Sequence, residues 1–231
     1  EMMLGNQSTG DGEYQLSTGT VTASNFYVGT DGVGDLTVSG GTMNLSQLRV
    51  GYGATGSGSV SVTGGLIGQT SSMVVGWDGD GYMSYTGGEV NVGDNLHVGY
   101  QQDGTGELIV TNTTLDIVDV FFIGDGGTGS VTQTSGVINA DNIEVGNTAS
   151  GIGSYVMDGG VLNLTGGDSH IGDSGTGVFI QNGGTVTNTY ATFLGGPGNA
   201  AASGTYILND GLLHQTDRAG NVGVQFLIGE D

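Results

Sequence analysis

A short glycine-containing motif recurs along the whole chain at a nearly constant spacing. A typical copy is an apolar pair that ends in glycine, followed by G-x-G and then by G-G. The glycines after the apolar pairs are 24, 22, 25, 23, 25, 22, 26, 23 and 34 residues apart, and we call them the anchoring glycines: Gly5, Gly29, Gly51, Gly76, Gly99, Gly124, Gly146, Gly172, Gly195 and Gly229. A period of this length is typical of a solenoid or an array of stacked repeats.

Between the glycines, apolar and polar residues alternate, which is the period-2 pattern of half-buried strands. We interpret each repeat as three short strands. In one repeat the expected inward side chains are Leu36, Val38, Met43, Leu45, Leu48 and Val50, and Thr37, Asn44 and Arg49 point outward. Two repeats later the inward positions hold Met83, Tyr85, Val90, Val92, Leu96 and Val98, and Ser84, Asn91 and His97 are expected to face solvent.

The pattern predicts an all-β fold over residues 1–231, a single three-sided β-helix (β-solenoid) of about nine coils with an irregular insertion around 214–225. The chain contains 50 glycines and one proline. Glycine allows positive φ and close approach of neighbouring coils at the corners. Helix is not expected, because every window that is long enough is interrupted by glycine or β-branched residues. With about 4.8 Å between coils, the rod should be about 43 Å long.

Charge and cysteine content indicate the surroundings of the chain. There are 23 acidic residues against two arginines, Arg49 and Arg218, with no lysine and no cysteine, and the formal charge is −21. This balance argues against nucleic acid as a partner. No signal peptide, membrane-spanning run or lipidation motif is visible, and the chain opens at Glu1 as a processed or excised segment would. We expect a secreted, extracellular or cell-surface protein.

Two stretches carry a resemblance to a known class of repeat. They are V-G-T-D-G-V-G-D-L-T-V-S-G-G-T-M-N-L from Val28 to Leu45 and V-G-W-D-G-D-G-Y-M-S-Y-T-G-G-E-V-N-V from Val75 to Val92. The pattern resembles the autotransporter-associated and PEP-CTERM-associated β-strand repeats of bacterial surface proteins, and the likeness extends over roughly residues 5–211. The resemblance implies a secreted passenger or surface rod rather than an enzyme.

Both ends of the chain carry the strand that precedes an anchoring glycine. One end holds Met2, Met3 and Leu4, and the other holds Phe226, Leu227 and Ile228. Solenoids usually have polar caps, because an open terminal coil exposes unpaired backbone groups and apolar core. We therefore expect copies to stack head to tail into a filament, a homopolymer formed by β-augmentation. The alternatives are a segment cut from a longer passenger, or a monomer with loops folded over its ends.

The outward positions offer a lateral surface. Five apolar residues that we expect to be exposed could form a strip for side-by-side packing of rods: Ile109, Phe122, Val156, Ile180 and Phe193. Scattered surface apolar residues are equally normal. A second outward column, rich in asparagine, is expected to form hydrogen bonds from coil to coil: Thr22, Asn44, Gly68, Asn91, Asp116, Asn139, Asn163 and Thr187.

Calcium is the cofactor to consider, because aspartates gather after the anchoring glycines. The candidate ligands are Asp78, Asp80, Asp103 and Asp125. Ca²⁺ needs six to eight oxygen ligands, and carboxylates on adjacent coils with backbone carbonyls could supply them. The alternative is that Asp-Gly pairs simply form good turns.

Three aromatic residues occupy the same corner of neighbouring repeats: Tyr52, Trp77 and Tyr100. They could stack to bind a surface glycan, which makes a carbohydrate-binding adhesin, or one that binds another cell-surface protein, the second functional hypothesis. A stack that only shields the corner is the alternative.

Catalysis is not expected. The two arginines are far apart and assemble no basic cleft for a polyuronate, and the acidic pairs sit in turns without a long loop to wall a cleft. His97 and His170 share a column but are three coils apart, about 14 Å, too far to share one metal ion.

Overall fold

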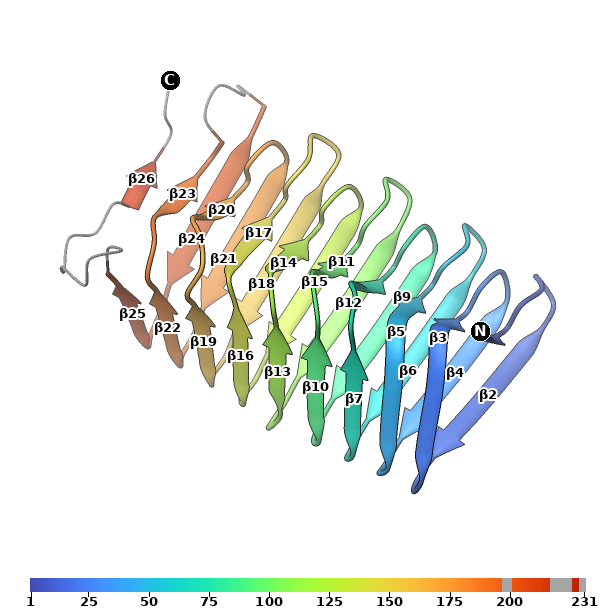
Figure 1. Ribbon diagram of the computed structural model, residues 1–231. Coiled ribbons are helices and arrows are strands. Elements are labelled where there is room, and N and C mark those ends of the chain that lie inside the picture. Colours follow the sequence, from blue (N-terminus) through green and yellow to red (C-terminus); the bar gives the residue numbers. More distant parts are fainter. Residues whose placement is uncertain (197–200, 217–225, 229–231) are drawn as a thin grey trace.

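The structure is a computed structural model that describes residues 1–196, 201–216 and 226–228, the last three by their backbone alone. This part of the chain consists of parallel strands and turns and contains no helix. The strands stack as a β-solenoid of about nine coils with a repeat near 24 residues, which confirms the predicted fold class. The coils follow one another along the rod, and one row of turns runs along its upper edge in Figure 1.

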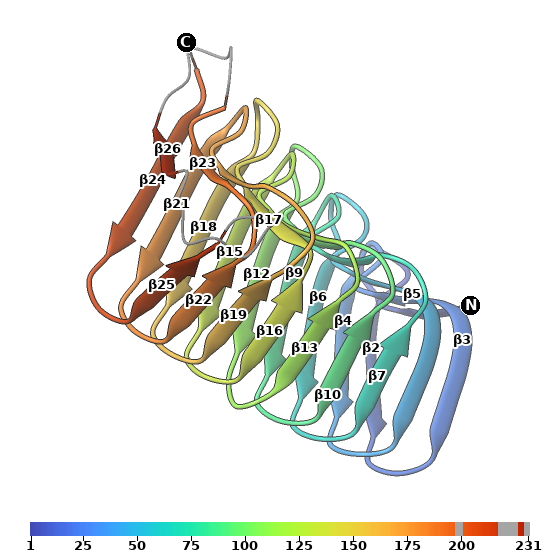
Figure 2. The same cartoon turned by 60° about the vertical axis from the view of Figure 1, so that its left-hand side comes forward.

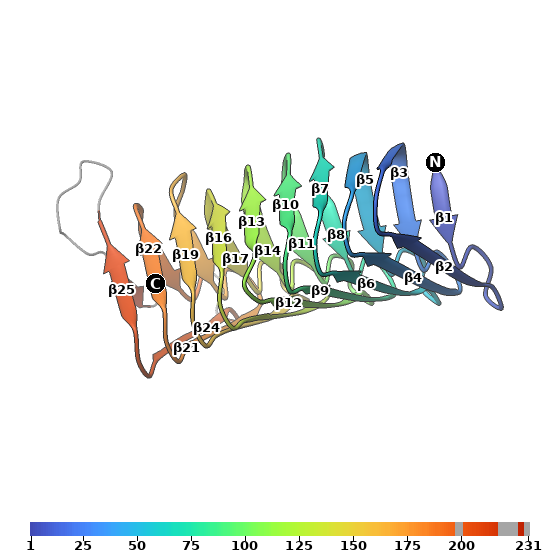
Figure 3. The same ribbon diagram turned by 90° about the horizontal axis from the view of Figure 1, so that it is seen from below.

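Each coil contributes one strand to each of three columns. The first column is a nine-stranded sheet made of β2 (Asp11–Leu16), β4 (Val33–Val38), β6 (Ser57–Val62), β9 (Asp80–Tyr85), β12 (Thr105–Val110), β15 (Thr128–Gln133), β18 (Ile152–Met157), β21 (Thr176–Gln181) and β24 (Ser203–Leu208). Seen from below in Figure 3, these strands lie side by side along the length of the molecule.

The other two columns form one 17-stranded sheet, because β3 (Thr20–Val28) and β5 (Thr42–Val50) each run through both. The second column continues with β7 (Leu66–Gln69), β10 (Glu89–Val92), β13 (Thr114–Ile117), β16 (Val137–Ala140), β19 (Val161–Leu164), β22 (Thr185–Asn188) and β25 (Leu212–Gln215). Figure 2 shows this column in front of the first. The third column contains β1 (Met2–Leu4), β8 (Met73–Val75), β11 (Leu96–Val98), β14 (Val120–Ile123), β17 (Asn142–Val145), β20 (Ser169–Ile171), β23 (Thr192–Leu194) and β26 (Phe226–Ile228).

A single apolar core extends from Leu4 to Leu194, and every predicted inward side chain of the two repeats analysed above is buried in it. Two tyrosine–glutamine hydrogen bonds lie within the core. The hydroxyl of Tyr155 donates to Oε1 of fully buried Gln133 at 2.5 Å, and Tyr206 donates in the same way to Gln181 at 2.5 Å. The Phe179 ring lies between these two tyrosines, with ring centroids 4.6 and 4.7 Å away. These hydrogen bonds and ring contacts therefore join the core side chains of successive coils.

Positive φ is concentrated at two corners of each coil. The anchoring glycine Gly76 has φ of 74°, and a Cβ there would lie 2.2 Å from the carbonyl oxygen of Thr105 in the next coil. At the corner between the first and second columns, most coils use the second glycine of the G-G pair. Three further coils use a single glycine, and in the remaining coil Asn112 takes φ of 51°, the one non-glycine residue with positive φ among the described residues. Glycine at the anchoring corner is thus required by both conformation and space.

The turns that join the third column to the first alternate in length, which we had not predicted. Five residues follow the anchoring glycine in one coil, as at 100–104, and three in the next, as at 125–127. In the long turns the closing glycine bonds within the turn, as from Gly104 N to Gln101 O at 2.9 Å. In the short turns it bonds to the anchoring glycine of the preceding coil, as from Gly127 N to Gly99 O at 3.2 Å. The structural unit along this edge is therefore a pair of coils.

The predicted insertion around 214–225 is described only in part. His214 and Gln215 belong to the regular strand β25, which pairs with β22. Residues 217–225 lie outside the described residues.

Candidate functional site

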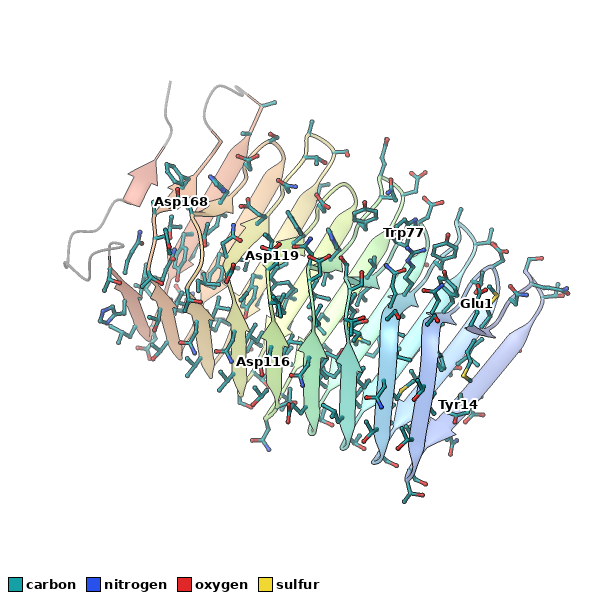
Figure 4. The ribbon with its side chains drawn as sticks, in the orientation of Figure 1. Glu1, Tyr14, Trp77, Asp116, Asp119 and Asp168 are labelled. Carbon is teal, nitrogen blue, oxygen red and sulfur yellow. The ribbon has the colours of Figure 1, made fainter. Side chains whose placement is uncertain are left out.

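Aromatic, basic and acidic side chains lie together on the face where the third column meets the turns. The outward residues of the third column are in register from coil to coil: Tyr27, Arg49, Val74, His97, Phe122, Glu144, His170 and Phe193. Beside them runs a row formed by the residue after each anchoring glycine: Thr30, Tyr52, Trp77, Tyr100, Asp125, Asn147 and Asp173. We call these two rows together the corner face. Figure 4 labels Trp77 at this row of turns.

The N-terminal half of the corner face is aromatic. The structure brings together the three predicted residues, with ring centroids of Tyr52 and Trp77 5.6 Å apart and those of Trp77 and Tyr100 4.6 Å apart. It adds Tyr27, whose ring lies 4.9 Å from that of Tyr52. The planes are tilted by 45–49° at each of these three contacts, so the rings form a continuous row rather than a parallel stack. Glycan binding by this row is still a prediction.

Arg49 lies within the aromatic row. Its guanidinium carbon is 4.0 Å from the ring centroid of Trp77, 5.0 Å from that of Tyr52 and 5.6 Å from that of Tyr27. These distances are in the range of cation–π contacts. Tyr27 is the in-register neighbour of Arg49 on β3, whereas Tyr52 and Trp77 come from the turns of two coils. Only the three-dimensional path of those turns shows the full cluster.

Further along the rod, His97 joins the two rows. Its Nδ1 lies 3.0 Å from Oδ2 of Asp125, and its ring stacks on Phe122 with centroids 4.7 Å apart. Asn147 donates to the other oxygen of Asp125 at 2.7 Å. Our expectation that His97 faces solvent is wrong, because Phe122 and Tyr100 cover the ring and leave the residue 8% exposed.

A second histidine–carboxylate pair follows three coils later. Nδ1 of His170 lies 2.9 Å from Oε1 of Glu144, and Asn142 donates to the same oxygen at 3.1 Å. Oε2 of Glu144 is buried with no hydrogen-bond partner in the described part of the chain. Burial raises the pKa of Glu144, and the hydrogen bond with His170 opposes that shift. The same hydrogen bond raises the pKa of His170, against the effect of its own burial.

The four aspartates predicted to bind calcium lie along the same row of turns but in different environments. Asp78 is half-buried in a short turn, Asp80 is exposed at the start of β9, and Asp103 is exposed in a long turn. Asp125 already accepts hydrogen bonds at both carboxylate oxygens if His97 carries its proton on Nδ1. Within the described ranges no group of three or more His, Asp or Glu side chains is arranged to hold a metal ion. Calcium binding, which can also use backbone carbonyls, is still a prediction.

The five residues of the predicted lateral strip lie on two sheets. Ile109, Val156 and Ile180 are outward residues of the first column, whereas Phe122 and Phe193 belong to the third. All five are half-buried rather than exposed. The first column alone supplies an apolar row, which Ile207 extends with 39% exposure.

In the second column the predicted polar row is in register, and part of it is hydrogen-bonded. Asn163 donates to Asn139 at 2.8 Å, and Asn139 donates to Asp116 at 2.5 Å, so three successive coils are linked on the outside. Asn91 instead bonds to Glu89 of its own strand at 2.9 Å. This row is a structural ladder over those three coils.

Alternation of turn length creates a shallow groove beside the corner face. Its sides are two long turns, and the short turn between them forms its floor. The lining residues are Tyr100, Gln101, Gln102, Asp125, Gly126, Thr148 and Ser150. Thr148 and Ser150 are fixed by hydroxyl bonds to the carbonyls of Asp125 and Gly126 at 2.6 and 2.7 Å. The groove therefore presents amide and hydroxyl groups next to the last ring of the aromatic row.

Comparison with known proteins gives no relative from which a function could be transferred: no family model, no curated protein and no solved structure matches this chain. In the described residues no helix has the length and apolar character needed to cross a membrane.

Proposed function

We propose that this chain is a non-catalytic structural rod of an extracellular bacterial surface, of the β-strand repeat type described above, and that copies assemble end to end. The observation that carries the proposal is a pair of complementary strand edges. β1 is paired on one side by β3, and β26 on one side by β23. Both lie in the third column and both pairings are parallel. A β1 strand from a second copy can add to β26 in the arrangement that β1 already makes with β3.

The last coil also exposes apolar surface. Leu208 occupies an inward position, in register with the fully buried Gln181, yet it is 50% exposed, and the neighbouring outward Leu212 is 53% exposed. Inward residues in the middle of the rod, such as Val110 and Met157, are completely buried. A further coil stacked on β24 would cover Leu208. Unpaired strand edges with apolar surface favour addition of another strand.

The contact between copies would be heterologous, joining the last coil of one copy to the first coil of the next. Such contacts repeat without closing, so they generate a filament. Met2, Met3 and Leu4 are the described residues on one side of this contact. Met2 is half-buried and Met3 is 40% exposed.

Electron microscopy and sedimentation velocity test the proposal. We expect filaments whose average length grows with protein concentration. Leu208→Asp places a carboxylate at the end of the apolar core and should leave single rods of 23.1 kDa. Val118→Asp is the matched control, because Val118 is 65% exposed in a turn in the middle of the rod. Single rods for the wild type, with and without calcium, would contradict the proposal.

A surface adhesin or passenger segment that binds a glycan or a protein partner is the second candidate. The aromatic row of the corner face favours it. Retention of the single rods on a glycan array, lost in Trp77→Ala, would support it independently of assembly.

A further inference from the structure

Arg49 has no carboxylate partner among the described residues, although the full sequence contains 23 acidic residues. The two ion pairs found in the described part of the chain both involve histidines, His97 with Asp125 and His170 with Glu144. The guanidinium of Arg49 instead contacts the rings of Tyr27, Tyr52 and Trp77, at the distances given above. Its positive charge is therefore not neutralised by any described carboxylate.

The nitrogens of Arg49 are unevenly exposed. Nε is buried and makes no hydrogen bond within the described residues. The two terminal nitrogens have no hydrogen-bond partner there either, but they are not among the buried atoms, so they reach solvent. A guanidinium presents its donors in a fixed planar fork. The fork at Arg49 therefore contacts aromatic rings and keeps two solvent-accessible terminal nitrogens.

A fork of this kind suits a carboxylate. Arg–carboxylate pairs are often bidentate, with two parallel N–H···O bonds, and contacts with aromatic rings fix the guanidinium before a ligand arrives. A carboxylate carries a single negative charge. On a chain with a formal charge of −21, a monoanion is repelled less than a doubly charged phosphate. The electrostatics therefore favour a ligand with one carboxylate at this position.

The surroundings of the fork suit a sugar ring. Tyr52 and Trp77 are half-buried, so part of each ring is accessible, and the C–H face of a pyranose packs on such surfaces. The row continues through Tyr100 into the groove lined by Gln101, Gln102, Thr148 and Ser150. Amide and hydroxyl groups of this kind can hydrogen-bond the hydroxyls of further sugar units. The ligand would lie along the rod, with its acidic unit at Arg49.

We propose that Arg49, Tyr52 and Trp77 form a binding site for the uronic acid unit of an acidic oligosaccharide, whose neighbouring units extend towards the Tyr100 groove. This inference is independent of end-to-end assembly. A longer polyuronate should gain little affinity over a short one, because the described residues hold no second arginine or lysine to meet another carboxylate and the net charge repels it.

Trp77 is the one tryptophan of the chain, so its fluorescence reports on the site directly. The experiment titrates a trisaccharide with one terminal glucuronic acid unit into the full chain, with its methyl ester as the neutral control. We expect a saturable change with the acidic trisaccharide and a much weaker response to the ester. Arg49→Met should weaken binding about tenfold or more, because a charged hydrogen bond is lost. Arg49→Lys keeps the charge without the fork and should weaken binding less.

Thermal melting of each variant shows whether it is folded. If Arg49→Met does not fold, the affinity of Arg49→Lys tests the role of the guanidinium. Titrations of Leu208→Asp, which should be a single rod, keep saccharide binding distinct from assembly. The proposal is overturned by no saturable response up to about 10 mM, a range that covers weak millimolar binding. Equal responses to acid and ester, or unchanged binding by both Arg49 variants, would overturn it as well.

Discussion

Glu144 and His170 form a pair in which one carboxylate oxygen of Glu144 has hydrogen-bond partners and the other has none among the described residues. Oε1 lies 2.9 Å from Nδ1 of His170, whereas Oε2 is buried without a partner among the described residues. The pair lies in the third column, with Phe193 stacked on the histidine at 5.0 Å. Asp173, Asp125 and Asp168 are the other charged groups that act on the pair.

This arrangement predicts that the pair contributes more to stability at low pH. Burial raises the pKa of Glu144, and the hydrogen bond to Glu144 raises the pKa of His170. A group whose pKa is raised by folding stabilises the fold below its ordinary pKa, and this contribution is lost as the pH rises through the folded value. The contribution should fall from acid pH up to pH values above the raised pKa of His170.

Urea unfolding midpoints at a series of pH values test this prediction. Because all the other carboxylates also ionise in this range, the informative quantity is the difference between wild type and variant. Glu144→Gln should flatten the pH dependence, since it removes both raised pKa values. Glu107→Gln, an exposed glutamate on β12, is the control and should follow the wild type. Identical pH profiles for wild type and Glu144→Gln would show that the pair does not have this role.

Replacing an anchoring glycine with alanine should strongly destabilise the fold. Gly76→Ala would place a Cβ at φ of 74° and 2.2 Å from the Thr105 carbonyl oxygen. We expect a loss of about 3 kcal/mol or more in the free energy of unfolding, from backbone strain and displacement of the next coil. Gly68→Ala is the matched control, because Gly68 lies in β7 with its nearest atom 3.9 Å from the added Cβ. Denaturant unfolding that gives equal losses for both variants would contradict the role assigned to this corner.

The three columns and their register follow from the sequence, because one-residue alternation between glycines fixes which side of each strand is buried. The alternating turn length could also have been predicted from the sequence. Coils with long turns span 24, 25, 25 and 26 residues from one anchoring glycine to the next, and those with short turns span 22, 23, 22 and 23. We used only the mean period, so the paired coils and the groove beside Tyr100 were missed.

The surroundings of Arg49 and His97 could not be predicted in this way. Period-2 alternation tells which way a strand residue points, but not what covers it. Phe122 beside His97 and Tyr27 beside Arg49 are strand neighbours that the register gives, but Tyr100, Tyr52 and Trp77 come from the turns. The path of a turn depends on backbone hydrogen bonds between coils, such as Gly127 N to Gly99 O. Lateral packing through the strip is still a prediction, and Phe122 and Ile109 face outward from different sheets.

The buried tyrosines allow a direct comparison of two hydroxyl environments. Tyr155→Phe removes the donor to Oε1 of Gln133, which is completely buried. Leaving that oxygen without a partner should cost about 1–3 kcal/mol. In Tyr85→Phe the lost contacts are to the sulfur atoms of Met83 and Met73, at 2.7 and 3.4 Å. Sulfur is a weak acceptor, so this loss should be below about 1 kcal/mol.

Denaturant unfolding of the two phenylalanine variants measures the difference. Both tyrosines are fully buried, so the loss of an oxygen atom from the core is common to them. A larger loss for Tyr85→Phe than for Tyr155→Phe would show that the tyrosine–glutamine bond is not the stronger interaction.

Asn112 takes the positive φ that a glycine takes at this corner in the other described coils, and it should tolerate substitution poorly. Its φ of 51° lies in the left-handed region, which asparagine adopts more readily than most residues and which β-branched residues strongly disfavour. Asn112→Val should therefore destabilise the fold by about 1–2 kcal/mol. Asn44→Val makes the same change at an exposed position in the extended strand β5, where valine is favoured, and should be neutral or slightly stabilising. If thermal melting places both variants at the same midpoint, then the backbone at this corner relaxes without strain when a β-branched residue is introduced.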